Sequence, residues 1–212
     1  MSGTHTGRRG DVWASHQWRF LAETAGEVRF RSAHVRPSPG DGSRSTADPG
    51  RSDRDTGDMA RLLIVHHTAS PSTQAMLESV LEGARTDEVE GVEVVTRAAL
   101  AATAVDVLAA DAVILGTPAN IGYMSGALKH FFDVVYYPCL SETAGLPYAL
   151  YVHGNNDTAG AVRAVESIAG GLSWQRHRPP VTVVGDLDRA DREACWELGA
   201  VTALAAAERA RG

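Results

Sequence analysis

Hydrophobic positions after residue 59 alternate between short apolar runs and longer stretches with helical spacing. Short apolar runs are typical of buried strands, whereas apolar residues three and four positions apart indicate one face of a helix. The alternation occurs five times, and each expected strand is followed by a helical pattern, the last from about 189 to 210. The pattern predicts an α/β fold, a doubly wound five-stranded parallel sheet with strands at 61–67, 91–97, 111–118, 147–154 and 179–186.

The pattern changes near residue 59, which divides the chain into two predicted parts. Residues 1–58 form an extension of low order, in which 37–58 contains a single apolar residue, Ala47, and is expected to be disordered. Residues 59–212 form the folded domain. Because Met59 stands just before the first strand, translation starting there would make the extension expendable, while docking of the aromatic residues within 12–35 is the alternative.

Charge and composition exclude several classes of partner. The chain has 20 Lys and Arg against 26 Asp and Glu, a net charge of −6, so neither nucleic acid nor an anionic membrane is expected to bind it. No apolar run approaches the roughly 18 residues of a membrane helix, and the first residues lack the apolar stretch of a signal peptide. Cys139 and Cys195 are far apart, which suits a reducing compartment. These features predict a cytoplasmic protein.

Four hydroxyl side chains crowd the loop after the first strand. The helix is expected to begin at about Pro71 with Ser70 as its N-cap, and free backbone N–H groups at a helix start favour an anion. A phosphate therefore fits this loop, although ordinary capping by Ser70 explains part of the pattern. The Gly-Lys signature of a nucleotide-hydrolysing P-loop is absent from the sequence. The hydroxyls belong to Thr68, Ser70, Ser72 and Thr73.

Two later loops also follow strands and have unusual compositions. The segment 116–124 contains a proline, two glycines, an asparagine and Tyr123, which suits a backbone that approaches a flat ligand closely with the tyrosine ring beside it. The segment 153–157, His-Gly-Asn-Asn-Asp, offers polar groups to a ring edge. An Asn/Asp turn that caps the next helix explains that segment equally well.

The motif GTPANIGYMSG, together with the hydroxyl-rich first loop, resembles the flavodoxin-like NAD(P)H-dependent FMN reductases and quinone reductases of the tryptophan-repressor-binding-protein type. The resemblance implies a sheet of order 2-1-3-4-5 and a bound FMN. It places the FMN phosphate on the four hydroxyls of the first loop, which here departs from the family by carrying Pro71 and Ser72 where glycines are usual. It implies that the isoalloxazine is lined by Pro118, Ala119, Asn120, Ile121, Gly122, Tyr123 and Met124, and that its pyrimidine edge is approached by His153, Gly154 and Asn155.

The function implied is an oxidoreductase that passes hydride from NAD(P)H through FMN to a quinone or another small acceptor. The sequence has no Gly-x-Gly-x-x-Gly loop, so NAD(P)H is expected as a transient co-substrate, and no protein side chain is expected to act as a catalytic residue. The histidines lack metal-ligand spacing, so no metal site is predicted. A non-enzymatic flavodoxin-type electron carrier and a flavodoxin-like fold without FMN are the alternatives. Assembly into a homo-oligomer is left open.

Overall fold

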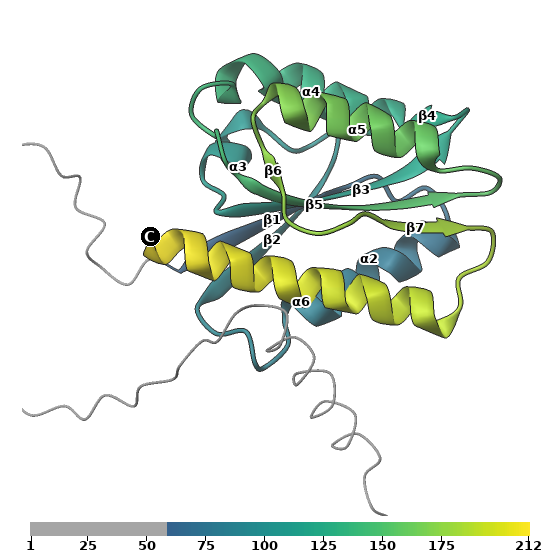
Figure 1. Cartoon of the computed structure of the whole chain (residues 1–212), viewed down its shortest axis with the longest axis horizontal. Helices are drawn as coiled ribbons and strands as arrows, with labels where there is room; N and C mark the ends of the chain where they lie inside the picture. Colours follow the sequence, from purple (N-terminus) through teal and green to yellow (C-terminus); the bar gives the residue numbers. More distant parts are fainter. Residues whose placement is uncertain (1–58) are drawn as a thin grey trace, which may run out of the picture. The chain divides into compact units, whose positions relative to one another are not determined.

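The computed structural model describes residues 59–212, and the predictions made for residues 1–58 lie outside the described residues. The described chain forms three layers, with a central sheet between two layers of helices (Figure 1). One face of the sheet is covered by α3 (Ala104–Leu108), α4 (Gly126–Cys139) and α5 (Ala159–Gly171), and the other by α2 (Pro71–Ala84) and α6 (Arg189–Arg211). The predicted α/β class is confirmed. None of these helices combines the length and apolar character needed to cross a membrane.

The main strands are parallel, and their order is β2-β1-β3-β5-β6. Because β1 lies between β2 and β3, the chain switches direction across the sheet between β1 and β3, as the order 2-1-3-4-5 requires. Ligands of such sheets bind beyond the carboxyl ends of the strands at this switch point. The four long strands are β1 (Ala60–His66), β2 (Val92–Ala98), β3 (Ala112–Asn120) and β5 (Pro147–Gly154).

The last predicted strand, 179–186, is shorter than expected, at Val181–Val184, and a separate two-residue strand that was not predicted precedes it. Two short strands, β6 (Gln175–Arg176) and β7 (Val181–Val184), each pair in parallel with a different part of β5. Pro179 and Pro180 lie between them, and proline has no N–H to donate to a ladder, so the pairing breaks there. The edge of the sheet is therefore formed by two fragments.

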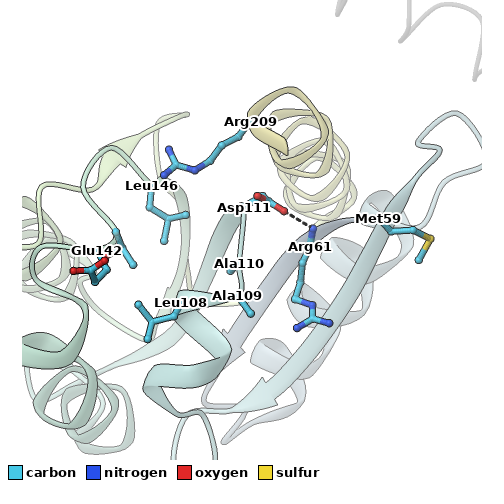
Figure 2. Close-up of a pocket in the computed structure, with 10 residues that line it drawn as sticks. Met59, Arg61, Leu108, Ala109, Ala110, Asp111, Glu142, Leu146 and Arg209 are labelled. Atoms are coloured by element: carbon cyan, nitrogen blue, oxygen red, sulfur yellow. Dashed lines mark hydrogen bonds between the residues drawn. The ribbon is translucent and has the colours of Figure 1, made fainter. Parts of the chain in front are cut away.

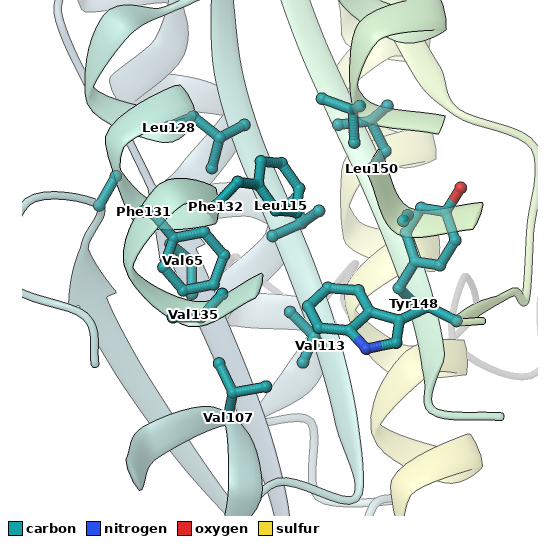
Figure 3. Close-up of a cluster of buried hydrophobic side chains, with 14 of the residues drawn as sticks. Val65, Val107, Val113, Leu115, Leu128, Phe131, Phe132, Val135, Tyr148 and Leu150 are labelled. Atoms are coloured by element: carbon teal, nitrogen blue, oxygen red, sulfur yellow. The ribbon is translucent and has the colours of Figure 1, made fainter. Parts of the chain in front are cut away.

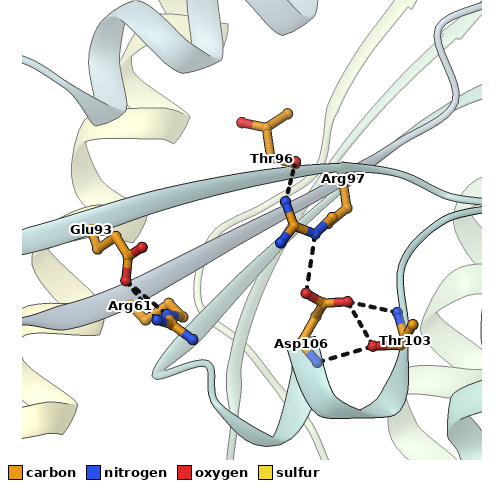
Figure 4. Close-up of polar contacts among 6 residues, drawn as sticks. All are labelled: Arg61, Glu93, Thr96, Arg97, Thr103 and Asp106. Carbon is orange, nitrogen blue, oxygen red and sulfur yellow. Dashed lines mark hydrogen bonds and ion pairs between the residues drawn. The ribbon is translucent and has the colours of Figure 1, made fainter.

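The helix expected within the alanine-rich stretch 98–110 is shorter than its composition suggests. Thr103 is the N-cap of α3: its hydroxyl accepts from the backbone N–H of Asp106, while the Asp106 carboxylate accepts from the backbone N–H of Thr103 at 2.9 Å. Arg97 pairs with the same carboxylate at 3.1 Å, and Arg61 pairs with Glu93 across β1 and β2 (Figure 4). This capping box fixes the start of the helix, so residues before Thr103 form a turn.

Two hydrophobic cores lie on opposite faces of the sheet. Beneath α4 and α5, Phe132 packs between Phe131 and Trp174, whose indole N–H donates to the Thr143 hydroxyl at 2.8 Å (Figure 3). On the other face, α2 and α6 approach each other closely. A Cβ on Gly199 would lie 2.1 Å from the carbonyl oxygen of a residue in α2, so only glycine permits this contact. Neither core covers the carboxyl ends of the strands, where the connecting loops lie.

Candidate functional site

Three loops gather at the carboxyl edge of the sheet. In the strand register, His66 at the end of β1 lies beside Gly116, and Pro118 lies beside His153 near the end of β5. The loops that follow β1, β3 and β5 are therefore neighbours. These are the three loops that the sequence selected.

The first loop uses two of its four hydroxyls to start α2. The Ser70 hydroxyl accepts from the Thr73 backbone N–H at 3.2 Å, as expected for an N-cap. The Thr73 hydroxyl accepts from the backbone N–H groups of Ala69 and Ser70 at 3.1 and 3.0 Å and donates to the Ser70 carbonyl oxygen at 2.9 Å. This capping box satisfies Ser70 and Thr73 internally. A ligand would have to compete with it for either hydroxyl.

The other two hydroxyls of this loop differ from that pair. The Thr68 hydroxyl lies 2.8 Å from Nδ1 of His66, and burial together with the neighbouring His67 lowers the pKa of His66. The Ser72 hydroxyl, on the half-buried first turn of α2, has no hydrogen-bond partner among residues 59–212. Ser72 is therefore the hydroxyl most available to an anion at the helix start.

The second loop is a tight hairpin, which the sequence did not predict. After β3 the chain reverses at once into β4 (Tyr123–Met124), with Asn120 opposite Tyr123. The two turn residues have positive φ angles, 51° at Ile121 and 70° at Gly122. Glycine adopts this conformation freely, whereas it costs a β-branched residue roughly 1–2 kcal/mol. The Ile121 side chain is nevertheless fully exposed, so its packing contributes nothing that would offset the free-energy cost of the strained backbone.

Buried polar contacts fix both ends of the hairpin. The Thr117 hydroxyl is inaccessible; it accepts from the Ser125 backbone N–H at 3.0 Å and donates to the Pro118 carbonyl oxygen at 2.9 Å. The Ser125 hydroxyl in turn accepts from the Leu128 N–H at the start of α4. Met124, expected to line the isoalloxazine, is only 2% exposed and belongs to the core beneath α4 and α5, because the pairing of β4 with β3 turns its side chain inward.

A hollow of about 530 Å³ lies between the hairpin and the loop after β5. One side offers apolar groups and backbone, and the other offers amide side chains and a carboxylate. The structure thus brings together residues of the second and third loops. It adds Asn156 and Asp157, which belong to the segment 153–157 but which the resemblance did not place at the ring. The lining residues are Ala119, Asn120, Ile121, Gly122, Asn155, Asn156 and Asp157.

The shape of the third loop depends on Gly154. A Cβ at this position would lie 2.4 Å from the carbonyl oxygen of Asp157, so the turn closes only over a glycine. The Asp157 carboxylate accepts from the Ala159 N–H at 2.9 Å at the start of α5, which holds the turn against the helix. Asn155 is thereby kept at the rim of the hollow.

Five residues expected at the flavin do not line this hollow: Pro118, Tyr123, Met124, His153 and Gly154. Pro118 is buried in β3. His153 is 7% exposed, and its Nε2 lies 2.7 Å from the carbonyl oxygen of Gly185, which β7 brings beside β5. Tyr123 lines a separate hollow on the other side of the hairpin. The alternation of side chains along paired strands decides these directions, and the sequence alone did not reveal them.

A further hollow, of about 390 Å³, lies at the opposite, amino edge of the sheet (Figure 2). The backbone N–H of Arg61 donates to the Asp111 carboxylate at 2.8 Å, and the Arg209 guanidinium donates to the Gly145 carbonyl oxygen at 2.9 Å. These groups tie together the amino ends of the strands and the end of α6. We therefore assign the site to the three loops at the carboxyl edge. Within residues 59–212, no three metal-binding side chains come together.

The doubly wound sheet, with a hydroxyl-rich helix start and a tight hairpin at its carboxyl edge, belongs to the flavodoxin-like class. Residues 68–184, more than half of the chain and including all three loops, match the family described as NADPH-dependent FMN reductase. The chain belongs to this family.

Individual relatives agree with this assignment. A flavodoxin from Aquifex aeolicus (strain VF5) is 42% identical over 77 residues, which are 36% of this chain and 40% of that protein. The match thus spans less than half the length of this curated relative. Among solved structures, a WrbA-like flavodoxin from Agrobacterium tumefaciens has a TM-score of 0.58 at 21% identity over 71% of this chain and 99% of its own. An archaeal flavodoxin has a TM-score of 0.59 at 18% identity over 69% and 98%. The structural matches show the shared fold.

Proposed function

We propose that this protein binds FMN at the carboxyl edge of the sheet and passes hydride from NAD(P)H, through the flavin, to a quinone or another small acceptor. The observation that carries the proposal is the hollow between the strained hairpin and the Asn-Asn-Asp turn, together with the helix start that follows the neighbouring strand β1 and has a free hydroxyl. Family membership supports the cofactor. The identity of the acceptor is part of the proposal.

The residues present suit FMN. A flat, mostly apolar ring system with polar atoms along one edge matches a hollow that has Ile121 and Gly122 on one side and Asn155 on the other. The phosphate would be held by the Ser72 hydroxyl and the positive end of α2, with the Thr68 hydroxyl nearby. The proposed set is smaller than the four hydroxyls that the resemblance implies, because Ser70 and Thr73 satisfy each other.

When bound, FMN supplies the redox chemistry, since its ring accepts hydride and returns electrons. The protein binds and orients the ring and limits the access of water. Ile121 would cover an apolar ring face, and contact with the flavin would offset the cost of its strained backbone. Asn155 would hydrogen-bond the ring edge from the rim of the hollow, where the closed Gly154 turn holds it.

The test has two stages. Purified protein is titrated with FMN and with riboflavin, and binding is followed by the flavin absorbance and fluorescence. We expect FMN to bind more tightly, because only FMN carries the phosphate. The FMN-loaded protein is then mixed with NADPH or NADH without oxygen, and we expect the flavin absorbance to bleach and to recover on addition of a benzoquinone. One site serving both substrates in turn gives ping-pong kinetics.

Failure at each stage has a distinct meaning. If neither flavin binds, the protein has the fold without the cofactor, and the proposal is wrong. If FMN binds but neither NADPH nor NADH reduces it, the enzyme assignment fails, and the flavodoxin-type carrier takes its place. That carrier should still accept electrons from a chemical reductant such as dithionite.

A further inference from the structure

A second hollow, of about 400 Å³, lies on the other side of the hairpin from the proposed flavin site. Its walls are the outer strand of the hairpin and the exposed side of α5. Gly122 lines both hollows, so only the turn of the hairpin separates them. The lining residues used below are Gly122, Tyr123, Gly160, Arg163 and Ser167.

Close backbone packing fixes the shape of this hollow. A Cβ on Gly160 would lie 1.9 Å from the carbonyl oxygen of Gly122, so the turn rests directly on the first turn of α5. The hairpin is also anchored by the buried Thr117 hydroxyl. Tyr123 is therefore held beside α5, with 44% of its surface exposed.

The hollow contains one charged lining residue, Arg163, and the charge is positive. Among residues 59–212, Arg163 takes part in no ion pair, and the nearest acid along α5, Glu166, is paired with Arg176. Ser167 follows Arg163 by one helical turn and lies on the same side of α5. The Arg163 guanidinium is therefore free to bind an anion in this hollow, and Ser167 adds a hydroxyl beside it.

These groups select for a particular ligand chemistry. A guanidinium and a hydroxyl together bind a phosphate through charge-assisted hydrogen bonds. An exposed tyrosine ring stacks on an aromatic base. A base joined through a sugar to a phosphate has both parts. The adenosine end of NADPH has this structure with a terminal phosphate on the ribose 2′ oxygen, whereas the adenosine end of NADH lacks the 2′-phosphate and carries only the pyrophosphate link.

We propose that the hollow formed by Tyr123, Arg163 and Ser167 binds the adenosine 2′-phosphate end of NADPH, and that Arg163 determines the preference for NADPH over NADH. The inference rests on the proposed function, in which the nicotinamide delivers hydride at the adjoining hollow. A dinucleotide has two ends joined by a flexible pyrophosphate, so its nicotinamide can stack on the flavin bound in the first hollow while its adenosine end lies in the second, which meets the first at Gly122.

The first experiment measures binding without any redox step. The FMN-loaded full chain is titrated calorimetrically with adenosine 2′,5′-bisphosphate and with 5′-AMP. We expect the bisphosphate to bind about 10- to 100-fold more tightly, which is the range for one charge-assisted phosphate contact. Arg163→Ala should remove this difference, and Arg163→Lys should keep part of it because lysine retains the charge without the planar fork.

The second experiment compares steady-state kinetics with the two cofactors. Arg163→Ala should raise KM for NADPH about 10- to 100-fold while leaving kcat and the constants for NADH nearly unchanged, because the contact lies far from the reacting atoms. Arg85→Ala is the matched control, since Arg85 is an exposed arginine at the end of α2 with no ion pair among the described residues. Arg85→Ala should change neither the ratio of the KM values for NADPH and NADH nor the ratio of the affinities for the bisphosphate and 5′-AMP.

Equal binding of the bisphosphate and 5′-AMP, or bisphosphate binding that survives Arg163→Ala unchanged, would overturn the inference. If FMN-loaded protein fails to oxidise NADPH yet binds the bisphosphate through Arg163, the proposed enzyme function fails and the phosphate site stands. If NADPH and NADH are oxidised equally well and Arg163→Ala changes neither, the function stands and the site assignment is wrong.

Discussion

Replacing Ile121 with asparagine should make the apo-protein more stable. Ile121 has a φ of 51° in the first position of the hairpin turn, followed by Gly122 at 70°. This is the arrangement of a type I′ turn, for which Asn-Gly is the preferred pair. Isoleucine is among the least suited residues, because its branched Cβ crowds the backbone in the left-handed region.

The size of the effect follows from two terms. Relief of the left-handed strain is worth roughly 1–2 kcal/mol, since asparagine tolerates this conformation. The loss of hydrophobic burial is close to zero, because the Ile121 side chain is fully exposed in the structure. For a protein of this length, about 1 kcal/mol changes Tm by about 2–4 °C, so Ile121→Asn should raise Tm by roughly 2–8 °C.

The assay is urea unfolding of flavin-free protein, followed by circular dichroism and tryptophan fluorescence. Removing the flavin matters, because a bound ligand stabilises the folded state by itself. Val105→Asn is the matched control: Val105 is also β-branched and 74% exposed, but it lies in α3 with a negative φ. This control should change the free energy of unfolding by less than about 0.5 kcal/mol. An Ile121→Asn variant no more stable than the parent would refute the strain argument.

The same variant tests why the strain persists. If Ile121 covers the flavin, Ile121→Asn should weaken FMN binding about 5- to 30-fold, as expected from losing one buried aliphatic side chain. Riboflavin binding should weaken equally, because the contact is to the ring and not to the phosphate. A more stable variant with unchanged affinity for both flavins would show that Ile121 lies away from the ring.

Three further predictions concern the first loop and the sheet. Ser72→Ala should weaken binding of FMN but not of riboflavin and leave Tm unchanged, whereas Ser70→Ala should lower Tm by about 2–4 °C through loss of the N-cap, as titration and thermal melts would show. Gly116→Ala should destabilise by at least about 1–3 kcal/mol in urea, because its Cβ would lie 2.0 Å from a buried tyrosine ring; Gly126→Ala, which meets nothing within 4 Å, is its control. Burial lowers the pKa of His66, so the folded chain binds fewer protons there than the unfolded chain, and stability present above pH 6.5 is lost as the pH falls through the folded-state pKa. His66→Asn should flatten this part of the pH–stability profile measured by urea unfolding. An unchanged slope would show that the pH dependence does not come from His66.

Much of the fold could be predicted because its signals are local. The apolar run 147–154 gave the limits of β5, and Ser70 with Pro71 gave the start of α2, since capping and strand patterns involve neighbouring residues. The edge of the sheet was predicted only in part. The apolar run after Pro179 and Pro180 indicated β7, whereas β6 consists of two polar residues and shows no apolar strand pattern.

The hairpin shows a different limit. The sequence 116–124 indicated a loop that approaches a ligand, and glycine and asparagine are common in tight turns. Ile121 made the turn difficult to predict from the sequence, because no propensity favours a β-branched residue at positive φ. A functional site that departs from local preference is therefore the kind of segment that local rules predict poorly.

The sequence by itself determined the α/β class, the order of the main strands and helices, and the three candidate loops, because hydrophobic spacing and capping act over a few residues. Only the tertiary structure decided what each loop residue contacts. His153 turns to Gly185 because β7 pairs with β5, and Tyr123 lies beside Arg163 because β4 packs on α5. These contacts join residues about 30 to 40 positions apart, so they depend on strand register and helix packing, which no local pattern encodes.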